Sequence, residues 1–228
     1  MTGQLDADRV RALFAELSDR LAAAGVSAQL FVVGGAAMAL AYDTGRVTRD
    51  VDALFMPAPE VRQIAEDMSS RHGLEPDWLN DAAKGFLPGN DEHPRTVFES
   101  ESLLVQIPSP EYMLAMKLHA SRDDRDLDDA AILFNTLGYT TAQECIDLLT
   151  DTYPLGQLLP RHRYLAEEVA TRARALQPPR PEGQTPNAGG VRRRRERRAT
   201  RSTGAFSDPF GIGRDHGPDQ PEPPARGF

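Results

Sequence analysis

The chain is poor in cysteine and in long apolar runs, and each shortage excludes a class of protein. The one cysteine, Cys145, rules out an internal disulfide and favours a reducing compartment; its setting in TAQECIDLL predicts a small buried side chain. The longest apolar stretch, residues 30–41, contains Gly34 and Gly35 and is too short to cross a bilayer. The N-terminus lacks a basic region followed by an apolar run, so no signal peptide is expected. These observations predict a cytoplasmic protein without membrane contact.

Positive charge is scarce over most of the chain. Residues 1–176 carry a net charge of −12 and residues 177–228 one of +4, within an overall charge of −8. An acidic body argues against a large nucleic-acid-binding face, so a polyanion would meet the C-terminal segment or a small focused site. Residues 191–201 hold seven arginines. We interpret this run either as part of a solvated tail or as a flexible arm that touches RNA.

Hydrophobic periodicity and turn residues predict the order of the structural elements. They predict an α/β (α+β) fold, in which a small mixed sheet is flanked by helices and followed by a helical C-terminal subdomain and a disordered tail. Ser109 and Pro110 are a helix-start signal, and residues 75–95 are expected to be irregular. The predicted domains are an α/β core (1–108), a helical subdomain that completes the site (109–176) and a Pro/Gly/Arg-rich tail (177–228). Strands are predicted at 29–33, 50–55, 96–100 and 102–107, and helices at 5–24, 36–42, 59–72, 110–121, 125–137, 141–152 and 161–176.

Two aspartates in DVDALF are the first candidates for chemistry. Asp50 and Asp52 occupy alternate positions of a predicted strand, so both side chains are expected on one face. Neighbouring carboxylates repel one another unless a cation neutralises them, and Mg²⁺ accepts such oxygen ligands while keeping positions for water and phosphate. Taken alone, the pair also fits two ordinary solvent-facing acids.

A pair of glycines precedes these acids. Gly34 and Gly35 follow a predicted buried strand and open a helix, so the backbone can approach a ligand closely. The amides of Gly34, Gly35 and Ala36 would then point at phosphate oxygens at the helix N-terminus. A tight turn with no ligand explains the glycines equally well. Together with the two aspartates, however, the pattern predicts a triphosphate held beside a carboxylate-bound metal.

A third element follows in LAMKLHASRDDRDLDD. Lys117 stands in an apolar helix of a chain that otherwise prefers arginine, which favours a specific role such as phosphate binding. The aspartates after it suit the first turn of the next helix, where acids complement the helix dipole. That explanation leaves at least one of Asp126 and Asp129 for the site, where it would orient Lys117 or assist the attacking group.

These three elements resemble the nucleotidyltransferase superfamily typified by DNA polymerase beta. GGAAMAL, TRDVD and LAMKLHASRDDRDLDD are similar to the recurring elements of its bacterial branch that includes the AbiEii-like toxins, and the resemblance covers roughly residues 28–137. It implies a transferase that uses a nucleoside triphosphate and Mg²⁺ or Mn²⁺. It also implies that Lys117 and one aspartate of the Arg125–Asp129 segment are catalytic.

One position departs from the superfamily pattern. A third metal-binding carboxylate usually lies on a later strand, where this chain offers the neutral Gln106, with Glu99 and Glu101 nearby. Arg49, directly before Asp50, is expected either to contact a phosphate or to form a salt bridge. His119, beside Lys117, is expected to be a packed residue rather than a base, and loop packing is the better explanation for Trp78 and Phe86.

The sequence therefore predicts a metal-dependent nucleotidyltransferase. Asp50 and Asp52 would hold the metal, Gly34, Gly35, Ala36, Arg49 and Lys117 would bind the nucleotide, and Asp50, Asp52, Lys117, Asp126 and Asp129 would be catalytic. The acceptor could be a tRNA end, a protein hydroxyl or a small molecule, and the resemblance favours the toxin of a toxin–antitoxin pair, with an antitoxin as partner. The alternative is an inactive binding or regulatory module with the same fold.

Overall fold

The computed structural model describes residues 4–42, 45–121 and 123–177. The predictions of disorder and RNA contact concern residues 177–228, of which 178–228 lie outside these ranges. No helix within the described ranges is long and apolar enough to cross a membrane. The helices are α1 (Ala7–Ala23), α2 (Gly34–Ala41), α3 (Ala58–His72), α4 (Pro110–Ala120), α5 (Asp124–Thr136), α6 (Ala142–Thr152), α7 (Arg161–Leu176) and the 3₁₀ turns η1 (Ala82–Phe86) and η2 (Leu155–Gln157).

A mixed sheet forms the centre of the first half, which confirms the predicted fold class. Its strand order is β3-β2-β1-β5-β4. The central strand β1 pairs with β2 in antiparallel and with β5 in parallel orientation, while β3 joins β2 in parallel and β4 joins β5 in antiparallel orientation. The strands are β1 (Ala28–Val32), β2 (Val51–Met56), β3 (Leu79–Asn80), β4 (Arg95–Glu99) and β5 (Leu103–Ile107).

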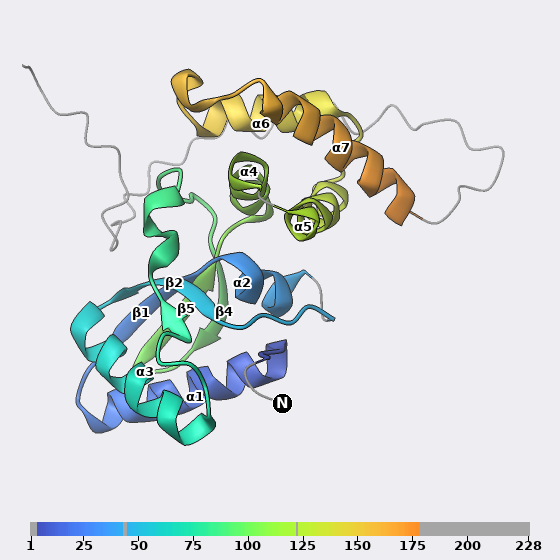
Figure 1. The fold of residues 1–228 in the computed structure, drawn as a ribbon. Coiled ribbons are helices and arrows are strands. Elements are labelled where there is room, and N and C mark those ends of the chain that lie inside the picture. Colours follow the sequence, from blue (N-terminus) through green and yellow to red (C-terminus); the bar gives the residue numbers. More distant parts are fainter. Residues whose placement is uncertain (1–3, 43–44, 122, 178–228) are drawn as a thin grey trace, which may run out of the picture.

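The two faces of the sheet carry different helices. Helices α1 and α3 lie against one face, and α4 to α7 lie on the other side (Figure 1). Because side chains alternate along a strand, Leu30 and Val32 of β1 join the main core. Phe31 and Val33 point the opposite way, where Phe31 packs edge-on against Tyr112 of α4 at 5.9 Å between ring centroids. The second face therefore meets the helical half, and the candidate residues of β2 and α4 lie near this junction.

Local capping explains where the helices of the second half begin. The Ser109 hydroxyl accepts a hydrogen bond from the Tyr112 amide at 3.2 Å, and Pro110 is the first residue of α4, as the sequence predicts. At α6, Thr141 and Glu144 form a capping box, in which each side chain pairs with the other residue's backbone. Such local signals place a helix without any knowledge of the tertiary structure.

The segment predicted to be irregular, residues 75–95, contains ordered elements that the sequence did not indicate. It holds the two-residue strand β3 and the turn η1. Trp78 is fully buried, and its indole nitrogen donates to the Ala65 carbonyl oxygen at 2.8 Å, so this side chain anchors the segment to α3. The Phe86 side chain is half exposed. Loop packing therefore explains Trp78, as expected.

The predicted strand at residues 50–55 needs a correction at its start. Strand β2 begins at Val51, and Asp50 lies in the bend before it. The reason is the pairing of β2 with its neighbours. Strand β1 turns into α2 at Gly34, and β3 first pairs at Leu79, opposite Val51, so a residue at position 50 has no strand beside it. Asp50 and Asp52 therefore stand at different places, one before the strand and one within it.

Packed aromatic rings join α4 to the helices that follow it. The His119 ring stacks on Tyr153 with 4.0 Å between centroids and lies 5.2 Å from the His162 ring. Burial lowers the pKa of both His119 and His162 below the ordinary value of 6.5. Cys145 of α6 is also buried, which raises the pKa of its thiol to about 12. His119 and Cys145 are thus packed residues, as the sequence predicts.

These two histidines predict a loss of stability in mild acid. The unfolded chain takes up protons near pH 6.5, whereas the folded chain takes them up only at lower pH. Their contribution to stability is therefore present above about pH 6.5 and is lost as the pH falls through the lower folded values. We expect urea unfolding midpoints to fall from pH 7.5 to pH 5.5. The fall in the midpoint should be smaller in His119→Phe, which keeps the ring stack. In the variant His93→Gln, whose histidine is exposed, the fall should equal that of the wild type. An equal fall in the wild type and both variants would contradict a contribution from His119.

Candidate active site

The glycine pair lies in direct contact with the segment that carries the two aspartates. Gly34 has a φ of +65°, and a Cβ atom on it would lie 3.1 Å from the Asp52 Oδ2 atom. A Cβ atom on Gly35 would lie 2.9 Å from the Thr48 hydroxyl oxygen, closer than such atoms pack. Because α2 begins at Gly34, the amides of Gly34, Gly35 and Ala36 have no acceptor within their own helix. A row of backbone donors and a carboxylate therefore meet where no side chain intervenes.

The segment before β2 is held to the body of the protein by its backbone. Leu5 and Thr48 exchange two backbone hydrogen bonds, of 2.7 and 2.9 Å, and Leu5 is fully buried. The Thr48 hydroxyl donates to the Asp50 carboxylate at a long 3.5 Å. Asp52, two residues on, is half-buried, and its carbonyl oxygen accepts from the Val33 amide at 2.8 Å. Asp50 and Asp52 thus follow a fixed point in the chain.

Gln106 lies on the same face of the sheet as Asp52. It pairs with Phe31, which in turn pairs with Leu54, two residues after Asp52 on β2. Within the three described ranges, no group of three His, Cys, Asp or Glu side chains converges in a way that could hold a metal. Besides Asp52, this face carries Glu99 of β4, which pairs with Leu104, two residues before Gln106 on β5.

Lys117 lies between the two aspartates that the sequence singled out. Its ammonium group donates to the Asp126 and Asp129 carboxylates at 2.7 Å each. The exposed fraction is 10% for the Lys117 side chain, 25% for Asp126 and 3% for Asp129. The structure therefore brings α4 and α5 together through these three residues, and it distinguishes a buried aspartate from a more accessible one.

Sequence reasoning missed a fourth member of this cluster, Arg46. Its guanidinium Nη2 atom donates at 3.0 Å to Asp129 Oδ2, the same oxygen atom that Lys117 contacts. The Arg46 side chain is 15% exposed, and its Nε atom is buried with no hydrogen-bond partner within the described part of the chain. The two residues lie 83 positions apart, so no local spacing indicates the contact. The sequence indicates Arg46 only by placing an arginine in the short segment between the glycine pair and Asp50.

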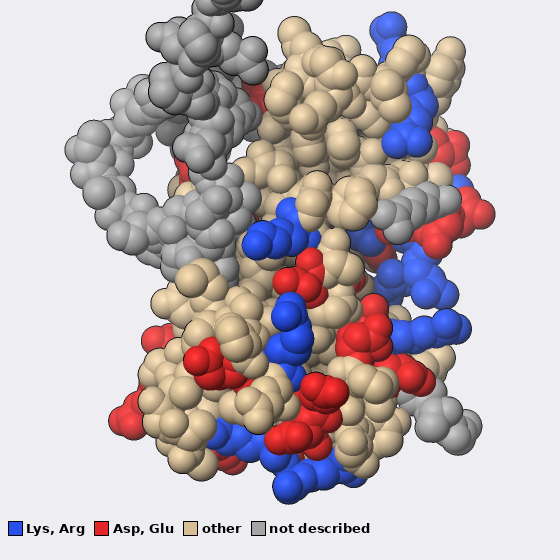
Figure 2. Space-filling view, turned by 60° about the vertical axis from the view of Figure 1, so that its left-hand side comes forward, with Lys and Arg blue, Asp and Glu red and all other residues tan. Residues whose placement is uncertain are grey.

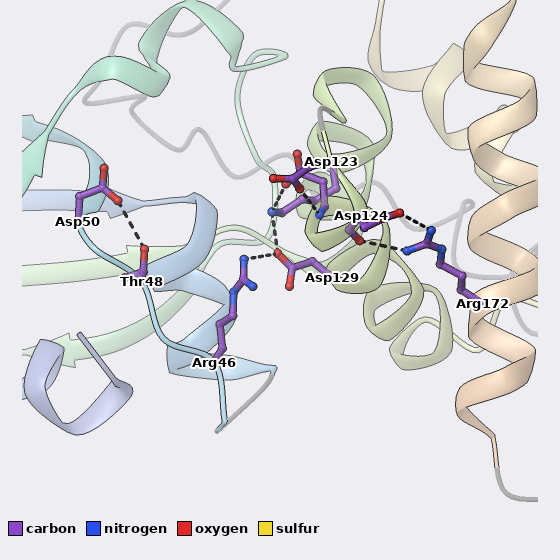
Figure 3. A network of polar contacts seen from close by, with 9 residues as sticks. Arg46, Thr48, Asp50, Asp123, Asp124, Asp129 and Arg172 are labelled. Atoms are coloured by element: carbon purple, nitrogen blue, oxygen red, sulfur yellow. Dashed lines mark hydrogen bonds and ion pairs between the residues drawn. The ribbon is translucent and has the colours of Figure 1, made fainter. Parts of the chain in front are cut away.

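The remaining acids of the Asp-rich segment serve α5 itself and its other face. The Asp123 carboxylate caps α5 by accepting from the Asp126 amide at 3.0 Å. Asp124 and Asp128 form ion pairs with Arg172 of α7, at 2.6 and 2.8 Å. Figure 3 shows Asp124 and Asp129 on opposite sides of α5, with Arg46 reaching Asp129 from the segment that leads to Thr48 and Asp50. Only Asp126 and Asp129 therefore face Lys117.

Arg49 lies on the surface of the protein. Arg49 is exposed and forms no ion pair with the described residues, so the salt-bridge interpretation finds no support there. In the view of Figure 2, acidic and basic side chains alternate over the half that contains the sheet. Contact between Arg49 and a nucleotide stays a prediction.

The residues around Gly34 suit a metal–phosphate group in their chemistry. Two carboxylates supply the hard oxygen atoms that Mg²⁺ prefers. The space beside Asp52 Oδ2 is one that a Cβ atom would fill, and glycine leaves it accessible next to the first backbone amides of α2. Two aspartates leave most positions of an octahedral ion to water and to phosphate oxygens. The donor set thus fits a divalent cation that is held jointly by protein and nucleotide.

Comparison with known proteins identifies a family. The model of a family described as "Nucleotidyltransferase of unknown function (DUF6036)" matches residues 8–150, which include every candidate residue discussed above. No curated protein and no solved structure matches the chain.

Proposed function

We propose, since the chain belongs to this family of nucleotidyltransferases, that it transfers a nucleoside monophosphate from a nucleoside triphosphate to an acceptor hydroxyl. The observation that carries the proposal is the contact between the glycine turn and Asp52. A side chain at position 34 would meet the Asp52 carboxylate at 3.1 Å, so a ligand on the amides of α2 would also lie beside that carboxylate. Phosphoryl chemistry requires this combination of anion donors and metal ligands.

The division of roles follows from the position of each group. The amides of Gly34, Gly35 and Ala36 bind phosphate oxygens, with Arg49 as a further contact from the segment beside them. Asp50 and Asp52 would hold Mg²⁺ or Mn²⁺, and such an ion, when bound, neutralises charge on the phosphates and favours departure of pyrophosphate. The protein itself mainly positions the phosphates and excludes alternative geometries.

Lys117 and its two aspartates supply the remaining chemistry. Two of the three ammonium protons go to Asp126 and Asp129, which leaves one for a phosphate oxygen. The acceptor hydroxyl loses its proton to a carboxylate, its oxygen bonds to the α-phosphorus, and the bond to the β-phosphate breaks. Asp129 already accepts from two cations, so the more exposed Asp126 is the better base of the two. Asp50 and Asp52 are the other candidate bases.

The acceptor is proposed on weaker support than the reaction. A tRNA end, a protein hydroxyl and a small molecule each offer the hydroxyl that the chemistry needs. The sequence likeness to AbiEii-like proteins supports a bacterial toxin that disables RNA or protein and is neutralised by an antitoxin. Residues 109–176 would act as the helical subdomain that completes the site, since they supply Lys117, Asp126 and Asp129.

One observation favours a second function, that of an inactive binding module. Gln106, a neutral residue, lies on the Asp52 face where the superfamily places a further carboxylate. A protein that lacks this ligand could keep nucleotide binding and lose turnover.

Metal-dependent labelling distinguishes the two functions. The purified chain is incubated with each α-³²P-labelled nucleoside triphosphate, MgCl₂ or MnCl₂, and tRNA, total RNA, a protein extract or glycerol as acceptor. We expect label on one acceptor class, its loss when the metal is chelated, and its return when metal is added in excess. The variant Asp67→Asn, on the exposed face of α3, should label as well as the wild type. Nucleotide binding in a calorimeter with no label on any acceptor would instead support the binding module.

A further inference from the structure

Arg46 belongs to neither sequence motif, yet it shares a carboxylate oxygen with Lys117. Both cations contact Asp129 Oδ2, at 3.0 and 2.7 Å. Two positive groups on one oxygen atom repel each other, and a carboxylate shared in this way holds each cation less firmly than it would hold one alone. A guanidinium keeps its charge at any working pH, so this competition is permanent.

The charges of the four side chains cancel. Arg46 and Lys117 supply two positive charges, and Asp126 and Asp129 supply two negative ones, all within hydrogen-bonding distance of a neighbour. Without Arg46, the same cluster would carry a charge of −1. A triphosphate is strongly anionic, and a nearby net negative charge would oppose its binding.

Arg46 also lies close to the proposed phosphate site. A Cβ atom on Gly35 would lie 4.0 Å from the Arg46 Nη2 atom, so the guanidinium passes the first turn of α2 where that residue has no side chain. The buried Nε atom has no hydrogen-bond partner among the described residues. A buried donor without a partner costs stability. Arg46 is thus poorly satisfied as a purely structural residue, which argues for a role of another kind.

We infer that Arg46 is a positioning residue that acts through Asp129: it competes with Lys117 for that carboxylate and so keeps Lys117 available to the triphosphate. This inference rests on the proposed function for its substrate. Lys117 keeps its place because α4 and Asp126 hold it, and its charge stays incompletely neutralised because Asp129 is shared.

Lysine reactivity tests the inference without any assay of transfer. The chain contains only two lysines, Lys117 and the exposed Lys84, so acylation by a small amine-reactive reagent can be read by mass spectrometry as a ratio of the two. In Arg46→Met, the Asp129 carboxylate interacts with Lys117 alone, so the Lys117 ammonium group is held more firmly against α5 and is less available to the reagent. We expect the Lys117 to Lys84 ratio to fall about tenfold, the factor that one charge-assisted hydrogen bond represents. If Arg46 only held the segment in place, the ratio would instead rise, because Lys117 would become more exposed in the variant.

Matched variants make the outcome decisive. Arg172→Met removes an arginine that pairs with two aspartates on the other face of α5 and should leave the ratio unchanged. Arg46→Lys restores the charge and should restore most of the ratio. Arg46→Gln is the second neutral variant if Arg46→Met does not fold, as judged by thermal unfolding. In the labelling assay, the KM for the triphosphate should rise about tenfold in the neutral variants, because the net charge beside it becomes −1.

Each result decides one question. An unchanged or raised Lys117 to Lys84 ratio in a folded neutral variant overturns the role of Arg46, whatever the transfer assay shows. A wild-type protein that transfers no label overturns the proposed function, while the acylation ratio still reports whether Arg46 competes for Asp129.

Discussion

Asparagine in place of Asp52 is expected to reduce nucleotide transfer on the order of 1,000-fold, since the loss of a metal ligand removes several kcal/mol of transition-state stabilisation. The fold should survive. Asparagine has the size of aspartate, and the backbone hydrogen bond between Asp52 and Val33 does not involve the side chain. We expect a change in the free energy of unfolding within about 1 kcal/mol. A rate measured with labelled nucleotide at saturating metal, beside a urea unfolding curve, checks both values.

Asp50→Asn should behave like Asp52→Asn if both residues hold the metal. The two acids differ in setting, because Asp50 lies in the bend before β2 and Asp52 lies within the strand against Gly34. A smaller loss for Asp50→Asn would identify Asp52 as the principal ligand. Transfer that continues at the wild-type rate in both variants would remove these residues from the mechanism.

Removal of the Asp129 carboxylate is expected to have the largest effect on stability. Asp129→Ala leaves Lys117 with Asp126 alone and removes the carboxylate that Arg46 contacts, at a position that is 3% exposed. Breaking a buried ion pair by deleting one partner costs about 3–5 kcal/mol, because the remaining charge stays buried. Guanidinium unfolding of the wild type and the variant measures this difference.

Asp124→Ala is the matched control on the same helix. Its side chain is 86% exposed and pairs with Arg172 on the other face of α5. Exposed pairs contribute about 0–1 kcal/mol, so this variant should unfold almost as the wild type does. If the two alanine variants lose the same stability, the Lys117 cluster is no more than a surface ion-pair network.

Much of the fold follows from local signals that do not depend on distant contacts. Ser109 and Pro110 start α4, Thr141 and Glu144 start α6, and both helices lie where the sequence predicts them. The mixed sheet follows in the same way from short apolar runs. Strand β3 could not be predicted, because a two-residue strand has no periodicity and exists only through its pairing with β2.

The candidate site was predictable where spacing along one element decides which residues share a face. Asp126 and Asp129 are three positions apart on α5 and face Lys117, whereas Asp124 and Asp128 are four apart and face Arg172. The sequence offers this spacing, although it does not say which face meets which helix. Arg46 could not be found, because its contact with Asp129 depends on how the segment before β2 lies against α5.

The backbone pairing of Leu5 with Thr48 has a practical consequence for work on this protein. Leu5, which precedes α1, holds the segment that carries Arg46, Thr48 and Asp50. A change that breaks this pairing would disturb the candidate site from a distance, because Thr48 and Asp50 follow the paired position. A substitution at Leu5 can therefore change activity without touching any candidate site residue, and such a loss should be traced to this backbone pairing first.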